Sequence, residues 1–77
     1  MLPPFDREAA DEEAMKKVTA FFGGRYNKIM TGLVRLRDRE RLSNSEMFKA
    51  MEYVGVVGYE AGALLRFIDR RLGDSHD

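Results

Sequence analysis

The chain has no cysteine, no tryptophan and a single histidine, His76, among its 77 residues. Without cysteine it can form neither a disulfide framework nor a thiolate metal site. His76 has only carboxylates near it in the sequence, and no glycine-rich phosphate loop or His/Glu metal spacing occurs. The sequence therefore predicts no metal site, no cofactor and no catalytic centre, so we expect a protein that is not an enzyme.

Long apolar runs are also lacking. Residues 53–68 carry only two charged side chains, Glu60 and Arg66, but this stretch is shorter than the about 20 apolar residues that span a bilayer. Residues 1–5 do not combine a basic segment with an apolar one, so we expect no signal peptide. These features predict a protein without a membrane segment, located in the cytoplasm.

The net charge is zero, but the charges are unevenly distributed. Residues 25–42 contain six basic and two acidic side chains, whereas the segments on either side of them are acidic. The middle of the chain therefore favours an anionic partner. Because the whole chain has no basic excess and no motif that reads bases, we do not expect this partner to be a nucleic acid.

Apolar residues recur at helical spacing from Met15 to Leu36. A pair of prolines precedes this segment, and Asp6 is placed to cap a helix that begins after it. Gly23 and Gly24 interrupt the pattern, at a cost of about 2 kcal/mol relative to alanine. One kinked helix and two separate helices both fit this pattern, and we favour the helix with a bend.

Ser43 and Glu46 have the spacing of a capping box, which marks the start of a second helix. We expect this helix to cover residues 44–72 and to end at Gly73. Because the turn before it is short, the two helices must fold back antiparallel. The sequence thus predicts an all-α fold, an antiparallel helical hairpin.

The hairpin forms a single domain over residues 1–77, with 1–5 and 74–77 as flexible tails. Two neighbouring apolar seams follow the second helix: Met47, Ala50, Val54, Val57, Ala61, Leu64 and Ile68, and beside them Phe48, Met51, Gly55, Gly58, Gly62 and Leu65. A helix that is apolar on most of its circumference must be buried nearly all round, which one hairpin cannot achieve. We therefore expect hairpins to assemble into a multi-helix bundle, a homo-oligomer.

The three glycines of the second seam, Gly55, Gly58 and Gly62, have two interpretations. Small residues at this spacing allow two helices to pack closely at a subunit interface. The missing side chains could instead leave a groove in which a ligand lies against the backbone, with Tyr53 and Tyr59 on either side. Both readings predict that bulk at Gly58 is harmful.

The basic segment also has two interpretations. Positive charge near a helix end can simply favour the helix dipole in solvent. Alternatively, basic side chains in one sector of the first helix bind phosphate oxygens, arginine bidentately, while a tyrosine stacks on a base. On this second interpretation the candidate ligand-binding residues are Arg25, Tyr26, Lys28, Arg35 and Tyr53.

The acidic helix start at residues 6–13 (DREAADEE), followed by an apolar helix, a turn and a last helix ending at 63–68 (ALLRFI), resembles the small phage proteins that sequester cyclic oligonucleotide signals (anti-CBASS sponges). In that family a helical hairpin assembles into a higher oligomer, and aromatic and basic side chains near subunit interfaces hold the nucleotide. The chain differs from that pattern at Phe5, where a tyrosine is expected, and at Phe21, where a basic residue is expected.

Two classes of function follow. The resemblance implies a phage anti-defence protein that sequesters a cyclic nucleotide or another phosphorylated small ligand. The alternative is a helical interaction or inhibitor module that engages a partner protein through an exposed helix face. The first requires basic and aromatic side chains on one concave site, whereas the second requires a surface that remains exposed after assembly.

Overall fold

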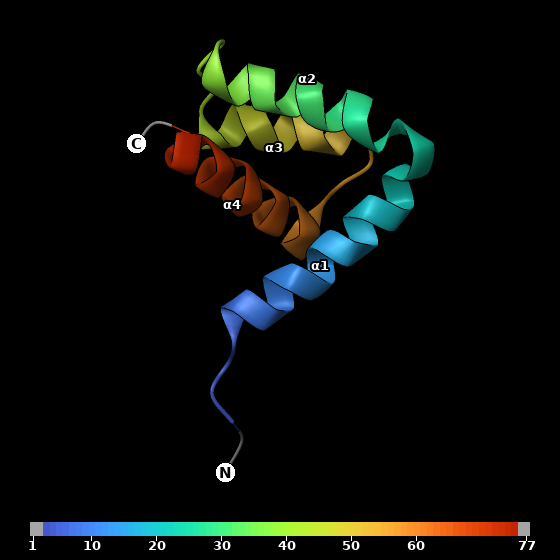
Figure 1. The fold of residues 1–77 in the computed structure, drawn as a ribbon, viewed down its shortest axis with the longest axis vertical. Helices are drawn as coiled ribbons and strands as arrows, with labels where there is room; N and C mark the ends of the chain where they lie inside the picture. The colour runs from blue at the N-terminus through green and yellow to red at the C-terminus, as the bar shows by residue number, and fades with distance from the viewer. Residues whose placement is uncertain (1–2, 76–77) are drawn as a thin grey trace.

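Four α-helices and one short 3₁₀ helix make up the part of the chain that the computed structural model describes, residues 3–75. These elements are α1 (Arg7–Phe22), η1 (Gly23–Arg25), α2 (Tyr26–Asp38), α3 (Asn44–Tyr53) and α4 (Gly58–Ser75). Helices α2 and α3 run antiparallel beside each other, with α4 next to them, while the first half of α1 extends away from α2 and α3 (Figure 1). Residues 3–75 contain no strand, which confirms the all-α class.

The start and the end of α1 follow the local sequence. The side chain of Asp6 accepts a hydrogen bond from the backbone N–H of Ala9 at 3.1 Å, as expected of an N-cap. At the other end Gly23 has φ +56°, a conformation that residues with a side chain rarely adopt. The chain therefore turns through η1 before α2 begins. The interruption expected at Gly23 and Gly24 is present, but it separates two helices, so the favoured single helix with a bend was wrong.

The expected second helix is two helices, so the prediction of one helix over residues 44–72 was wrong. The capping box at its start is present, because Ser43 and Glu46 each accept a hydrogen bond from the other's backbone N–H. The helix then ends at Gly55, which has φ +91°. The N–H of Val56 bonds to Met51 O at 2.8 Å and that of Gly55 to Glu52 O at 3.0 Å, the hydrogen bonds of a Schellman motif.

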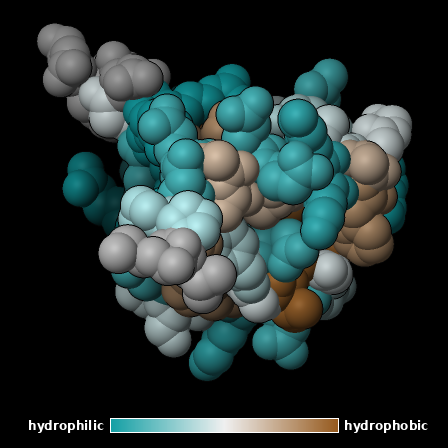
Figure 2. All heavy atoms as spheres, turned by 90° about the horizontal axis from the view of Figure 1, so that it is seen from below, coloured by the Kyte–Doolittle hydropathy of each residue, from teal (hydrophilic) through white to brown (hydrophobic). Residues whose placement is uncertain are grey.

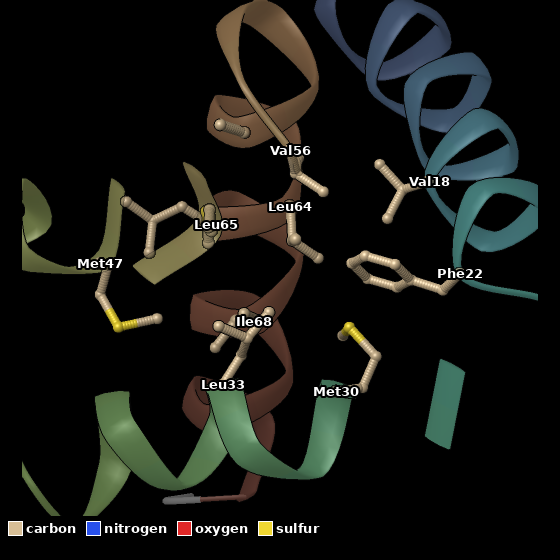
Figure 3. Packing of buried hydrophobic residues seen from close by; sticks show 11 residues of the cluster. Val18, Phe22, Met30, Leu33, Met47, Val56, Leu64, Leu65 and Ile68 are labelled. Atoms are coloured by element: carbon tan, nitrogen blue, oxygen red, sulfur yellow. The ribbon is translucent and has the colours of Figure 1, made fainter. Parts of the chain in front are cut away.

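This break lets all four helices enclose one core (Figure 3). Side chains from each helix and from the connection between α3 and α4 meet there, and Met47, Met51, Leu64 and Ile68 are the largest that are fully buried. Figure 3 shows Val18 and Phe22 of α1 facing Val56 and Leu64, with Met30 and Leu33 of α2 closing the opposite side. Each fully buried aliphatic side chain contributes about 1.5–3 kcal/mol to folding.

The break after Tyr53 thus interrupts both apolar seams. Leu64 and Leu65 are buried within one chain, whereas Val57 is 58% exposed. One chain therefore covers most of α4, and the physical reason given above for an oligomer no longer holds.

The glycines of the second seam have different surroundings within one chain. Gly58 is the first residue of α4, with φ +64°, and no atom lies within 4 Å of the position that a Cβ would take there. The nearest atoms to such a Cβ at Gly62 belong to the Arg66 side chain of the same helix. Within residues 3–75 these two glycines are not at a close approach between helices, because the first serves the turn into α4.

Arg37 joins the ends of α2, α3 and α4. Its guanidinium donates to both carboxylate oxygens of Asp69 at 2.8 and 3.0 Å. The same group donates to Leu42 O and to Asn44 Oδ1, each at 2.8 Å. These bonds hold α2 and α3 at a fixed separation at the end of the helix pair where the connecting turn lies.

None of the described helices is long and apolar enough to cross a membrane. Helix α4 continues past the expected end at Gly73 to Ser75. Residues 3–6 precede α1 without helical structure. The remaining positions of the predicted flexible tails, Met1, Leu2, His76 and Asp77, lie outside the described residues.

Candidate functional site

An open groove of about 940 Å³ runs between α2 and α3. Its lining residues come from the start and one face of α2 and from the last turn of α3: Arg25, Lys28, Ile29, Gly32, Leu33, Leu36, Ala50, Tyr53 and Val54. The α2 members recur at spacings of three and four, so they occupy one side of the helix. The groove is therefore a direct product of the helical period of α2 and the antiparallel placement of α3.

Gly32 keeps the middle of the groove open. Its backbone is helical, and a Cβ added there would meet no atom within 4 Å. A glycine inside a helix costs about 1 kcal/mol relative to alanine. A ligand that filled the open space beside Gly32 would offset this cost.

The groove combines an apolar floor with cations at one end. Leu33 is buried, and Ile29 and Leu36 are half-buried and pack against the core. Arg25 and Lys28 are both exposed at the end nearest η1. Such a site can hold a ligand that has one anionic part and one flat, weakly polar part.

Tyr53 forms the opposite wall and is 91% exposed. A tyrosine ring costs little free energy when it stays in water, because its hydroxyl is polar. It also offers a stacking surface to a planar group such as a nucleobase. It stands at the end of α3, directly before the Schellman motif, so its backbone is fixed by the hydrogen bonds of that turn.

Three of the five residues selected from the sequence, Arg25, Lys28 and Tyr53, line this groove. Tyr26 does not, because it is half-buried with its ring centre 6.4 Å from that of Phe22. Arg35 is exposed but is not among the lining residues. Sequence reasoning missed the apolar floor and Gly32, although the spacing of Lys28, Gly32 and Leu36 could have indicated them.

A second polar cluster joins α1 to α4. Asp11 is buried, and its carboxylate accepts hydrogen bonds from Arg66 at 2.8 and 2.9 Å and from the Tyr59 hydroxyl at 2.6 Å. The guanidinium of Arg66 also lies over the Tyr59 ring, 5.5 Å from its centre. Phe5 contacts the same ring edge-on, with ring centres 6.4 Å apart.

These contacts explain the protonation properties of the cluster. The hydrogen bonds from Arg66 and then Tyr59 hold the pKa of Asp11 well below its usual range. The hydrogen bond to Asp11 raises the pKa of Tyr59 in turn. The side chains of Asp11, Tyr59 and Arg66 are hydrogen-bonded within the cluster. We therefore interpret the cluster as a structural contact between α1 and α4. Sequence reasoning took Asp11 for part of an acidic helix start, yet its position on the same face as Ala14 and Val18 indicated burial.

No group of three or more histidine, aspartate or glutamate side chains within residues 3–75 could hold a metal ion. Comparison of the chain with protein-family models, with curated proteins and with solved structures gave no match.

Proposed function

We propose that this protein is a non-enzymatic binding protein that holds a phosphorylated small ligand of the cyclic nucleotide type in the groove between α2 and α3. The observation that carries the proposal is the meeting of Arg25, Lys28 and Tyr53, from two helices, around one apolar floor. The two cations can donate hydrogen bonds to phosphate oxygens, and the tyrosine ring can stack on a base. A charge-assisted hydrogen bond of this kind contributes about 1.5–3 kcal/mol.

The biological role proposed is sequestration. The helix starts and apolar spacing that resemble phage anti-CBASS sponges suggest that the ligand is a signal and that its capture counters a host defence. A protein that removes an intracellular signal acts in the cytoplasm. Capture needs affinity and abundance rather than bond-making groups.

A second candidate function rests on the same surface. Apolar side chains form most of the groove, and an amphipathic helix of a partner protein can lay its apolar face into such a site. Acidic residues at one end of that helix would pair with Arg25 and Lys28. The two functions differ in what the cations contribute, because a nucleotide depends on them far more than an apolar helix face does.

A thermal-shift screen against cyclic di- and trinucleotides, with linear nucleotides as controls, tests the first function. A ligand that binds only the folded state raises the Tm once its concentration exceeds the dissociation constant. Light scattering on the same samples reports the mass of the species that binds.

Gly32→Leu provides a matched variant for this screen. Because the site of its Cβ is open and leucine favours helix more than glycine does, the variant should fold at least as well as the wild type. Its side chain would occupy the groove, so the nucleotide-induced rise in Tm should disappear. A shift that survives in Gly32→Leu would place the ligand elsewhere.

A further inference from the structure

Gly23 sets the direction in which the chain passes from α1 to α2. Its φ of +56° is left-handed, whereas Phe22 before it and Tyr26 after η1 have the φ of a helix, −70° and −54°. No atom lies within 4 Å of the position that a Cβ would take at Gly23 or at Gly24. The turn therefore depends on the backbone conformation of Gly23 and not on the close approach of another group.

The sequence around this turn is compatible with a straight helix. Apolar or aromatic side chains recur every four residues through it, at Val18, Phe22, Tyr26 and Met30. If the turn adopted helical backbone angles, residues 7–38 would form one helix about 48 Å long. Because α1 and α2 run from η1 in different directions (Figure 1), such a helix would carry α1 away from α4 of its own chain.

A straightened single chain would expose part of the core. Ala14, Val18 and Phe22 of α1 are buried, and α1 packs mainly on α4. Figure 3 shows Val18 and Phe22 facing Leu64. Contact of these apolar side chains with water is unfavourable. A second straightened copy presents the same α1 and the same face of α4, so each copy can cover the surface that the other exposes.

This association requires no further apolar surface. On the face shown in Figure 2, polar side chains cover most of the surface and apolar side chains emerge only in separate patches. An exchanged α1 instead re-forms contacts that the single chain already makes, including the hydrogen bonds that Arg66 and Tyr59 donate to Asp11. Exchange of an identical element is a low-cost route to a dimer, because the interface is already complementary.

We propose that Gly23 is a hinge between two states of this chain, the bent monomer and a dimer in which two straightened copies exchange α1. Glycine adopts the left-handed conformation of the monomer without strain, whereas most residues with a side chain favour the straight helix of the dimer. Self-association is thereby placed at the contact between α1 and α4. The groove between α2 and α3 contains no residue of α1, so the proposal does not depend on the proposed ligand.

Gly23→Ala and Gly23→Asn are matched variants for testing the hinge. Each adds a Cβ to open space, but asparagine tolerates the left-handed conformation far better than alanine does. Size-exclusion chromatography with light scattering, from low micromolar to submillimolar concentrations, measures the dimer dissociation constant. This constant should be at least about tenfold lower for Gly23→Ala than for the wild type or Gly23→Asn, because only alanine penalises the bent state.

Three results would overturn the proposal. The first is a Gly23→Ala variant that stays monomeric over this concentration range. The second is a wild type or Gly23→Asn variant that dimerises as tightly as Gly23→Ala. The third is loss of helical circular dichroism in Gly23→Ala, because the exchanged dimer keeps the helices and core contacts of the monomer.

Charge complementation in the Gly23→Ala background tests whether α1 is exchanged. Asp11→Arg in one chain and Arg66→Asp in another each place like charges at the contact between α1 and α4. In an exchanged heterodimer, the new cation on α1 of one copy would meet the new carboxylate on α4 of the other, and the native pair would form at the second contact. The two variants refolded together should therefore have a higher Tm than either alone. A mixture that melts as the sum of its two components would show that α1 stays on its own chain.

Discussion

Arg66 and Asp11, 55 residues apart in the sequence, form a bidentate ion pair in which Nε lies 2.8 Å from Oδ2 and Nη2 lies 2.9 Å from Oδ1. The pair joins the first turns of α1, which extend away from α2 and α3, to the middle of α4 (Figure 1). Because the Asp11 residue is only 8% exposed, loss of Arg66 leaves a largely buried carboxylate without its counterion.

The Asp11–Arg66 pair should make stability depend on acid pH. The Asp11 carboxyl has a pKa lower in the folded chain than its ordinary value of 3.8. Its contribution is therefore fully present above about pH 5 and is lost as the pH falls through the unfolded-state pKa toward the folded-state one. We predict that the Tm of the wild type falls more steeply with acid than that of Asp11→Asn, measured by circular dichroism.

Glu12→Gln is the control for this experiment, because Glu12 is an exposed carboxyl next to Asp11. The Tm of Glu12→Gln should fall with acid as steeply as that of the wild type. If the Tm of the wild type and that of Asp11→Asn fall equally steeply with acid, the Asp11–Arg66 pair does not stabilise the fold in the way described.

The core should be most sensitive at Leu64. This side chain has no exposed surface and lies between α1 and α2 (Figure 3). Leu64→Ala should reduce the free energy of unfolding by about 2–5 kcal/mol, through lost burial and the cavity left behind. Without ligand, Tyr53→Ala should change it by less than about 0.5 kcal/mol, since that side chain is almost fully exposed. Urea denaturation measures the free energy of unfolding of both variants. An equal loss in Leu64→Ala and Tyr53→Ala would contradict the assignment of the core.

Gly58 should tolerate substitution according to backbone conformation rather than size. Its φ of +64° is left-handed, and the space around it is open. Gly58→Leu should therefore cost about 1–2 kcal/mol through backbone strain. Gly58→Asn should cost less, because asparagine adopts this conformation more readily than other residues with side chains. Denaturation curves that rank the asparagine variant below the leucine variant would contradict a cost set by the left-handed backbone conformation.

Local signals explain which parts of the fold the sequence predicts. The cap at Asp6, the capping box at Ser43 and the interruption at Gly23 each depend on residues within one helical turn, and all three are present. The break after Tyr53 was missed because apolar spacing continues through it. Gly55 followed by two β-branched residues was the available signal, since glycine favours a helix end and valine adds little helix propensity.

The candidate site depends on both local and long-range information. Arg25 and Lys28 share a face of α2, which spacing alone predicts. Their position opposite Tyr53 requires the antiparallel placement of α3, and the expected hairpin did include that reversal. Tyr26 does not line the groove, because its ring packs near that of Phe22, four residues before it. The partners of Asp11 lie in a helix 48 and 55 residues away, beyond the reach of any local pattern.

Isothermal titration calorimetry with a panel of cyclic di- and trinucleotides measures binding in the α2–α3 groove most directly. We predict that at least one binds with a dissociation constant below about 100 μM. Arg25→Ala/Lys28→Ala should weaken it by about 100-fold or more, because two charge-assisted contacts are lost. Arg39→Ala, an exposed arginine of the same basic segment that does not line the groove, should bind as the wild type does. Absence of binding across the panel, or wild-type affinity in the double variant, would contradict nucleotide capture by this groove.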